Sequence, residues 1–218
     1  MLCSEPGNLG IKPGVKVSQL LNVAFDMCVW EILGCLLNGG TLILRGSKKQ
    51  DWVDALMAVN VVIATPTILQ GHRAANYPNV RVVATAGEPC PQPLADEWSV
   101  DKTFYNCCGP TEVGEPLTFV FRTVGSFAEQ TTIVNTMHRH CRGTSPSIGV
   151  PIPNNRVYIL DENLQPLPIG CIGIMWAAGP CVSSGYVNRP ELTGQKYVQD
   201  RFCDDGCVSR LSTFLPRL

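Results

Sequence analysis

Between residues 15 and 112, short apolar stretches alternate with segments of helical spacing, and this alternation limits the chain to few folds. Strands that are apolar throughout and separated by helices are typical of a parallel sheet with both faces covered. We therefore predict an α/β fold. The first expected strand begins at residue 15. The other expected strands span 41–44, 61–66, 80–89 and 103–112. Helices are expected at 26–40, 51–59 and 93–98, and a further helix is expected to begin near residue 67.

The helix at 26–40 has two boundary signals. Asp26 can cap its start, and Gly39-Gly40 can end it. Five apolar residues recur at helical spacing within it: Val29, Ile32, Leu33, Leu36 and Leu37.

Small or polar residues follow three of the expected strands. The sequences are ATPT (64–67), TAGEP (85–89) and CCGPTE (107–112). Ligands of parallel sheets bind beyond the carboxyl ends of the strands. The three ends together predict a binding site, although ordinary turns would explain any one of them.

The pattern changes after about residue 145. Short strands are expected at 156–160 and 172–176, separated by Asn-Asn, Asp-Glu-Asn and Pro-Ile-Gly turns. This indicates a small antiparallel, barrel-like β subdomain, with its boundary within 132–147.

Composition excludes several classes of protein. The chain is 45% hydrophobic and 16% charged, with a net charge of −1, so neither disorder nor a field that attracts nucleic acid or an anionic membrane is expected. No apolar run approaches the roughly 20 residues of a membrane helix, and the start lacks a signal-peptide core. We expect a cytoplasmic location.

Eleven cysteines could suggest disulfides. The odd count and the lack of a secretory signal favour small buried thiols instead, in apolar runs that hold Cys28, Cys35, Cys107, Cys108 and Cys171. A zinc site from His138, His140 and Cys141 is disfavoured, because these residues lack the two-pair spacing of a structural site.

Three stretches carry a family resemblance: FDMCVWEILGCLLNGGTLIL (25–44), YNCCGPTE (105–112) and SIGVPIPNNRVYILDENLQPLPIG…GYVNRPELT (147–193). In this order they resemble the adenylation domain of nonribosomal peptide synthetases, within the adenylate-forming (AMP-binding) superfamily, and are similar to fungal forms. The resemblance implies a partial α/β AMP-binding subdomain at 8–131, a β-rich subdomain at 132–202, and a tail at 203–218 that is unlike the family.

The resemblance also implies an activity. Such ligases use ATP and Mg²⁺ to activate an amino acid or related carboxylic acid as acyl-AMP. The acyl group then passes to the phosphopantetheine thiol of a carrier domain, often in secondary metabolism. The implied partners are a small-molecule acid and a carrier domain in the parent synthetase, with no nucleic acid or membrane.

The resemblance assigns roles residue by residue. Thr111 would bind phosphate and Glu112 would hold Mg²⁺, while Asp26 would pair with the substrate's α-amino group unless it caps the helix. The nucleotide side would consist of Gly87, Glu88, Cys108 and Gly109. The acid pocket would be lined by Met27, Trp30, Ile63, Ala84, Ala86, Cys107, Ile133 and Val134. Without the resemblance, these pocket residues would be read as ordinary core.

The sequence departs from the family in several places. Cys108 stands where an aromatic residue usually stacks on adenine, which would weaken ATP binding. Residues 114–131 are an expected insertion, either a translated intron or a tolerated surface loop.

Three further elements of the family do not match: the phosphate-loop lysine, the ribose-binding Tyr-x-Thr-Gly-Asp segment and the C-terminal catalytic lysine domain. We therefore expect an inactive fragment. The alternatives are an acyl- or aryl-acid CoA ligase, which would not need Asp26, and a non-catalytic nucleotide-binding or interaction module.

Overall fold

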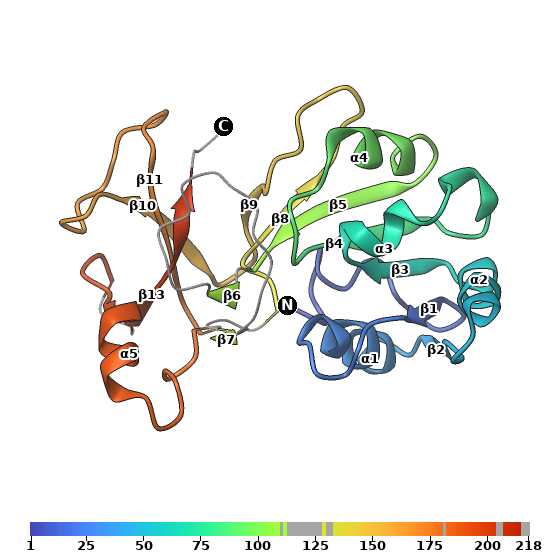
Figure 1. Ribbon diagram of the computed structural model, residues 1–218, viewed down its shortest axis with the longest axis horizontal. Coiled ribbons are helices and arrows are strands. Elements are labelled where there is room, and N and C mark those ends of the chain that lie inside the picture. The colour runs from blue at the N-terminus through green and yellow to red at the C-terminus, as the bar shows by residue number, and fades with distance from the viewer. Residues whose placement is uncertain (110, 113–127, 130–132, 181, 204–206, 215–218) are drawn as a thin grey trace. The chain divides into compact units, whose positions relative to one another are not determined.

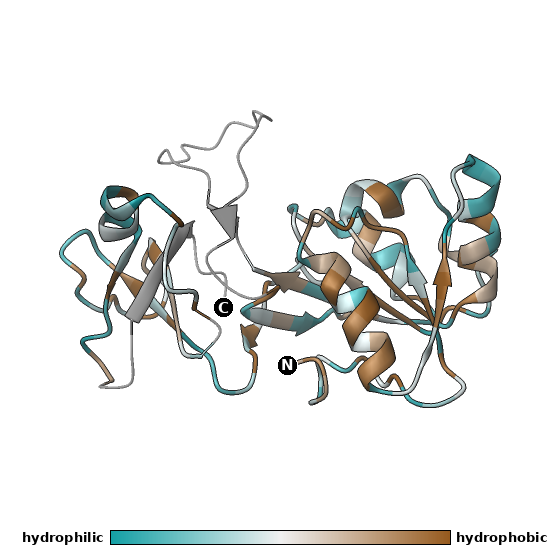
Figure 2. Cartoon of the chain, turned by 90° about the horizontal axis from the view of Figure 1, so that it is seen from below, coloured by the Kyte–Doolittle hydropathy of each residue, from teal (hydrophilic) through white to brown (hydrophobic). Residues whose placement is uncertain are grey.

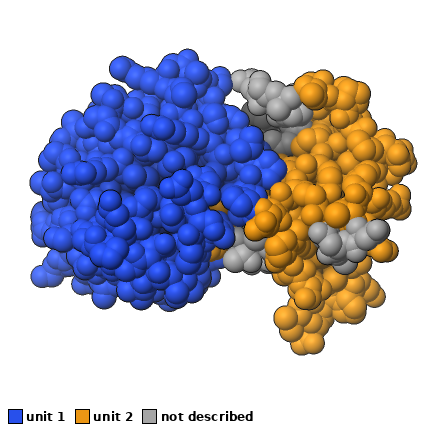
Figure 3. Space-filling view, turned by 180° about the vertical axis from the view of Figure 1, so that it is seen from behind, with its two compact units in different colours: residues 1–108, 136–153 blue, residues 109–135, 154–218 orange. Residues whose placement is uncertain are grey.

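A computed structural model describes residues 1–109, 111–112, 128–129, 133–180, 182–203 and 207–214. The chain forms two compact units, coloured separately in Figure 3. Unit 1 comprises residues 1–108 and 136–153, and unit 2 comprises residues 109–135 and 154–218.

Unit 1 is built on a seven-stranded sheet with the order β2-β1-β3-β4-β5-β8-β9 (Figure 1). Five neighbouring strands are parallel: β1 (Lys16–Gln19), β2 (Thr41–Leu44), β3 (Val61–Ala64), β4 (Val82–Thr85) and β5 (Thr103–Cys108). Two antiparallel strands extend this sheet, β8 (Thr136–Arg139) and β9 (Val150–Pro151). The predicted parallel sheet of an α/β fold is therefore confirmed.

Helices cover both faces of this sheet. The helical elements are α1 (Met27–Leu37), α2 (Lys49–Ala58), α3 (Pro66–Gln70), the 3-10 turn η1 (Ala74–Asn76) and α4 (Gln92–Trp98). In Figure 1, α1 lies on the opposite side of the sheet from α3 and α4. All four residues of β3 are buried, as expected for a strand covered on both faces.

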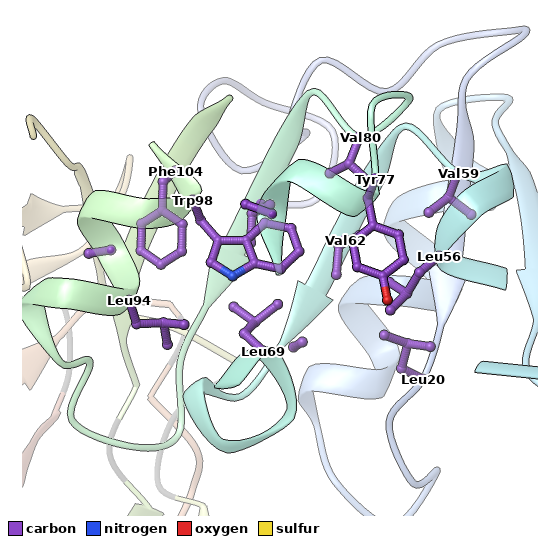
Figure 4. Packing of buried hydrophobic residues seen from close by; sticks show 14 residues of the cluster. Leu20, Leu56, Val59, Val62, Leu69, Tyr77, Val80, Leu94, Trp98 and Phe104 are labelled. Atoms are coloured by element: carbon purple, nitrogen blue, oxygen red, sulfur yellow. The ribbon is translucent and has the colours of Figure 1, made fainter. Parts of the chain in front are cut away.

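The main core lies between the sheet and the helices α2, α3 and α4 (Figure 4). Trp98 at the end of α4 is fully buried and stacks on Tyr77, with ring centroids 6.1 Å apart. Val62, Val83 and Phe104 contribute from successive strands. Successive side chains of a strand point to opposite faces, so these three residues identify the sheet face that carries this core.

Helix α1 buries a different side from the one that its apolar spacing suggests. Its buried residues are Met27, Cys28, Trp30, Glu31, Gly34 and Cys35. Four of the five periodic apolar residues are exposed, to 38% for Val29, 45% for Leu33, 56% for Leu36 and 61% for Leu37. Figure 2 shows how strongly hydrophobic this helix is.

Unit 2 is largely antiparallel, as predicted for the second half of the chain. Its four-stranded sheet has the order β10-β11-β13-β12, and α5 (Pro190–Lys196) precedes β12. The strands are β10 (Arg156–Leu160), β11 (Gly173–Ala178), β12 (Tyr197–Gln199) and β13 (Cys207–Phe214). A separate ladder joins β6 (Thr111–Glu112) to β7 (Ala128–Glu129). Most of the expected insertion at 114–131 lies outside the described residues.

The chain passes between the two units at 108/109, 135/136 and 153/154. Residues 136–153 belong to unit 1, because β8 pairs with β5 and β9 pairs with β8. Part of the tail that was expected to be unlike the family, residues 207–214, forms β13 between β11 and β12.

The cysteine prediction holds in part. Cys28, Cys35 and Cys107 are buried and Cys108 is half-buried, but Cys171 is exposed, so its interpretation as a buried thiol was wrong. Cys171 lies in a turn just before β11 rather than inside the strand.

In the part of the chain that the structure describes, no three His, Cys, Asp or Glu side chains are gathered as metal ligands. No helix among these residues has the length and apolar character needed to cross a bilayer.

Candidate functional site

The three polar strand ends predicted from the sequence lie side by side. Ala64 pairs with Thr85 across β3 and β4, and Thr85 pairs with Asn106 across β4 and β5. Because these strands are parallel, the chain leaves all three at the same edge of the sheet. The segments ATPT, TAGEP and CCGPTE therefore begin next to one another, as expected.

The turn after β4 is in contact with two other elements. Gly87 is exposed and has a φ of +84°, a left-handed conformation that L side chains rarely adopt. A methyl group added at Gly87 would lie 3.6 Å from Sδ of Met27 and 3.8 Å from Cγ2 of Thr65. The start of α1, the end of β3 and the turn after β4 therefore meet at one place.

The carboxylate of Glu88 is bound by the start of α3. Its Oε2 accepts hydrogen bonds from the Thr67 N–H at 3.0 Å and from the Thr67 hydroxyl at 2.6 Å. Thr65 caps the same helix, since its hydroxyl accepts from the Ile68 N–H at 3.4 Å. Sequence reasoning missed Thr65 and Thr67, although both belong to the strand-end segments that it singled out.

The expected pocket residues of unit 1 share one sheet face. Along β3, β4 and β5 the side chains of main-core residues point to one face of the sheet. The side chains of Ile63, Ala84 and Cys107 occupy the alternate positions, so they point to the opposite face, where α1 lies. Met27 and Trp30 come from the buried side of α1. The indole N–H of Trp30 donates to the Gly7 carbonyl at 2.7 Å, which ties this side chain to the N-terminal segment.

Those residues are also closely packed. The exposed fraction is at most 6% for all six: Met27, Trp30, Ile63, Ala84, Ala86 and Cys107. The structure brings them together on one face, and their assignment to an acid pocket stays a prediction.

The end of β5 carries two protonated thiols. Burial, with the neighbouring Cys108 as a smaller cause, raises the pKa of Cys107 well above its usual value. Burial alone raises the pKa of Cys108 to about 12. At neutral pH both groups are therefore neutral and poor nucleophiles, which agrees with an inert packing role.

Within unit 2, Gly109 packs directly against the chain that returns after the insertion. A methyl group at Gly109 would collide with the Ile133 carbonyl oxygen and lie 2.7 Å from Cα of Val134. Ile133 and Val134 are buried. The two residues expected to complete the pocket wall thus lie beside the turn that follows β5.

Thr111 and Glu112 are described only as the backbone of β6, paired with Glu129 and Ala128. Their side chains lie outside the described residues. Their expected roles with phosphate and metal stay predictions.

Asp26 immediately precedes α1 but does not cap it through its side chain. The residue has helical backbone angles, φ −62° and ψ −31°, and no side-chain capping hydrogen bond. Its carbonyl accepts from the Val29 N–H at 2.8 Å, and its side chain is half-buried. The capping interpretation is wrong, and the role opposite an amino group stays a prediction.

Glu31 was missed by the sequence reasoning. Its carboxyl group is fully buried in unit 1 and accepts from the N–H of Leu20 at 2.7 Å and of Leu21 at 3.1 Å. Burial raises its pKa to about 8, although both amides, Gln19 and Arg45 lower it. A charged residue inside the apolar run VWEIL was the available signal.

Two surface hollows lie elsewhere, beside α2. One of about 370 Å³ is lined by Lys49, Trp52, Gly71 and His72. The other, of about 330 Å³, lies between β2 and α2. Neither is lined by a residue of the expected site.

Comparison with known proteins identifies the family. Residues 4–187 match the AMP-binding enzyme family. Adenylate-forming reductase 06235 of Coprinopsis cinerea is 47% identical over 208 residues, which cover 95% of this chain and 18% of that protein. The nonribosomal peptide synthetase echPS of Aspergillus ruber is 35% identical over 209 residues, which cover 96% of this chain and 9% of that protein.

A similar fold occurs in a solved structure, that of holo-AB3403, a four-domain nonribosomal peptide synthetase bound to AMP and glycine. The TM-score is 0.75 at 22% identity, covering 93% of this chain and 15% of that one. The chain thus spans less than a fifth of the length of each of these three proteins. With most of its length matched by the family, the chain belongs to the AMP-binding enzymes.

Proposed function

We propose that this chain forms one side of an adenylate-forming site, in which ATP activates an amino acid or related carboxylic acid as acyl-AMP. The observation that carries this proposal is the meeting of Met27, Thr65 and the exposed turn at Gly87 at one edge of the sheet. Asp26 directly precedes Met27 and lies at the start of the same helix.

In this reaction a carboxylate oxygen of the acid attacks the α-phosphorus of ATP, and pyrophosphate leaves. The contribution of the protein is mainly to align these groups and to offset the negative charge that develops. Gly87, which has no side chain, would let adenine approach the backbone closely. Asp26 would pair with the α-amino group, and Met27 would contact the side chain of the acid. The acyl group would then pass to the phosphopantetheine thiol of a carrier domain.

The residues expected at the metal suit Mg²⁺ in kind. A threonine hydroxyl and a carboxylate are hard oxygen donors, and Thr111 and Glu112 are consecutive in the sequence. Bound Mg²⁺ would supply positive charge to the phosphates. Glu112 would hold the metal and Thr111 would donate to a phosphate oxygen.

A second candidate is activation of an acyl or aryl acid without an amino group. The relative that is 47% identical is named an adenylate-forming reductase and the one that is 35% identical a nonribosomal peptide synthetase, so relatedness by itself does not select an amino acid as the substrate. Asp26 separates the two, because only an α-amino group needs its carboxylate.

The test is binding of non-hydrolysable acyl sulfamoyl-adenosines by calorimetry, comparing an aminoacyl compound with its analogue lacking the amino group. We expect the wild type to prefer the aminoacyl compound and Asp26→Asn to lose about tenfold or more of that preference. A hydrogen bond to a charged group contributes about 1.5–3 kcal/mol, and 1.4 kcal/mol corresponds to about tenfold.

An equal affinity of the wild type for both compounds would favour the second candidate. No binding of any acyl-adenosine compound would overturn the proposed function. ATP–pyrophosphate exchange by the 218-residue chain alone is expected to stay at background, since the lysines that the family uses are not found in it. Turnover above background would contradict that expectation.

A further inference from the structure

The segment that joins β1 to α1 is fastened to α1 by a single buried side chain. The Glu31 carboxyl accepts from two consecutive backbone amides, Leu20 at 2.7 Å and Leu21 at 3.1 Å, eleven and ten residues earlier in the chain. Glu31 itself lies in the second turn of α1, the helix to which this segment leads. The contact therefore closes the chain on itself between the end of β1 and α1.

A second side chain binds Leu21 at its carbonyl group. The Gln19 amide donates to the Leu21 carbonyl at 2.5 Å and contacts Sγ of Cys28 at 3.6 Å. Leu21 is thus bound at its N–H by Glu31 and at its carbonyl by Gln19. Only four residues then separate Leu21 from Asp26.

Those four residues form a compact turn. The Asn22 side chain accepts from the Ala24 N–H at 3.0 Å, and the Asn22 carbonyl accepts from the Phe25 N–H at 3.0 Å. A short turn between a bound residue and a helix has few conformations available. The position of Asp26 therefore depends on where Glu31 holds Leu20 and Leu21.

A buried carboxyl group is costly, because removing it from water costs several kcal/mol unless its hydrogen bonds offset the loss. An apolar side chain of similar size would avoid this cost but would leave the Leu20 and Leu21 amides without these acceptors. The raised pKa of Glu31 reflects that cost. A carboxyl group offers two acceptor oxygens, the number needed to bind both amides.

We propose that Glu31 is a positioning residue of the acid-binding side of the site: by binding the Leu20 and Leu21 amides it fixes the turn that presents Asp26 and Met27. This inference rests on the proposed function, in which Asp26 and Met27 contact the acid. Glu31 does not itself contact the substrate.

The test compares Glu31→Gln and Glu31→Ala with Cys35→Ala in the full 218-residue chain. Cys35 is buried on the same helix one turn later, which makes it a matched control for a general loss of packing. Gln keeps one acceptor oxygen and Ala keeps none, so Glu31→Ala should have a larger effect on the turn than Glu31→Gln.

The first measurement is the preference for aminoacyl over deamino sulfamoyl-adenosine. We expect Glu31→Gln to reduce it severalfold and Glu31→Ala to reduce it about as far as Asp26→Asn does. Binding of AMP should be unchanged in both, and Cys35→Ala should retain the full preference. Retention of the preference by Glu31→Ala, or an equal loss in Cys35→Ala, would overturn the proposal.

The second measurement is hydrogen exchange of the peptide spanning 20–26, which requires no ligand and so separates this inference from the proposed function. Faster exchange there in both Glu31 variants, but not in Cys35→Ala, supports the positioning role even if the wild type binds no acyl-adenosine. Exchange that is unchanged relative to wild type would overturn it.

Discussion

Replacing Glu31 by Gln should remove a specific part of the pH dependence of stability. The folded-state pKa of Glu31 is about 8, against 4.5 for an ordinary glutamate, with burial as the main cause. Between these values the folded state retains a proton that the unfolded state has lost. The free energy of unfolding therefore falls as pH rises through this window, by about 1.4 kcal/mol per pH unit for one proton.

From pH 5.5 to 7.5 this slope corresponds to about 3 kcal/mol in the wild type. The variant cannot titrate at this position, so the difference between the two proteins isolates the contribution of Glu31. The other groups that face the carboxyl are the Arg45 guanidinium, which lowers the pKa, and the Cys28 thiol, whose own pKa is raised from 9. Cys28 thus titrates above the window.

The assay is urea denaturation of both proteins at half-unit steps between pH 5.5 and 7.5. Between pH 5.5 and 7.5 the free energy of unfolding of the wild type should fall by about 3 kcal/mol more than that of Glu31→Gln. At pH 5.5 the variant should be the less stable protein, because its amide nitrogen cannot accept from the Leu21 N–H. Parallel curves for the two proteins would refute the reasoning, since they would mean that Glu31 titrates normally when folded.

Three further predictions concern packing and backbone. Gly87→Ala should lower the free energy of unfolding by about 1–2 kcal/mol, because φ is +84°, and should weaken binding of AMP. The control Gly170→Ala, at φ +91° in open space, should lower the free energy of unfolding by the same amount without weakening AMP binding. If both variants bind AMP equally, Gly87 does not face the nucleotide. Trp98→Ala should cost about 3–5 kcal/mol in urea denaturation, because the side chain is fully buried. Leu33→Gln combined with Leu36→Gln should lower binding of a hydrophobic dye and self-association with little loss of stability, since both side chains are exposed; a loss above about 1 kcal/mol would show that they are packed.

The expectations that held best rest on local signals. The strands at 41–44 and 156–160 have the predicted bounds, because apolar runs between turn residues identify them without reference to the rest of the chain. The helix before Gly39 and the parallel order of β3, β4 and β5 follow from the same alternation. The shared edge of the three polar strand ends is then a consequence of parallel pairing.

The individual site residues needed more than periodicity. The resemblance supplied Asp26 and Met27, and the fold brings Met27 to Gly87. The contact of Gly109 with the Ile133 backbone depends on a return across an interrupting segment that no local pattern encodes.

The sequence by itself determined the fold class, the family and the edge of the sheet where a site would lie, because each depends on short-range spacing and on motifs. Only the tertiary structure decided which side of α1 is buried, that Glu31 binds the Leu20 and Leu21 amides, and that β8 and β9 join the first sheet. The physical reason is that periodicity shows that a helix or strand has an apolar side but does not show which partner covers it. That choice is made by pairing and packing between residues far apart in the chain.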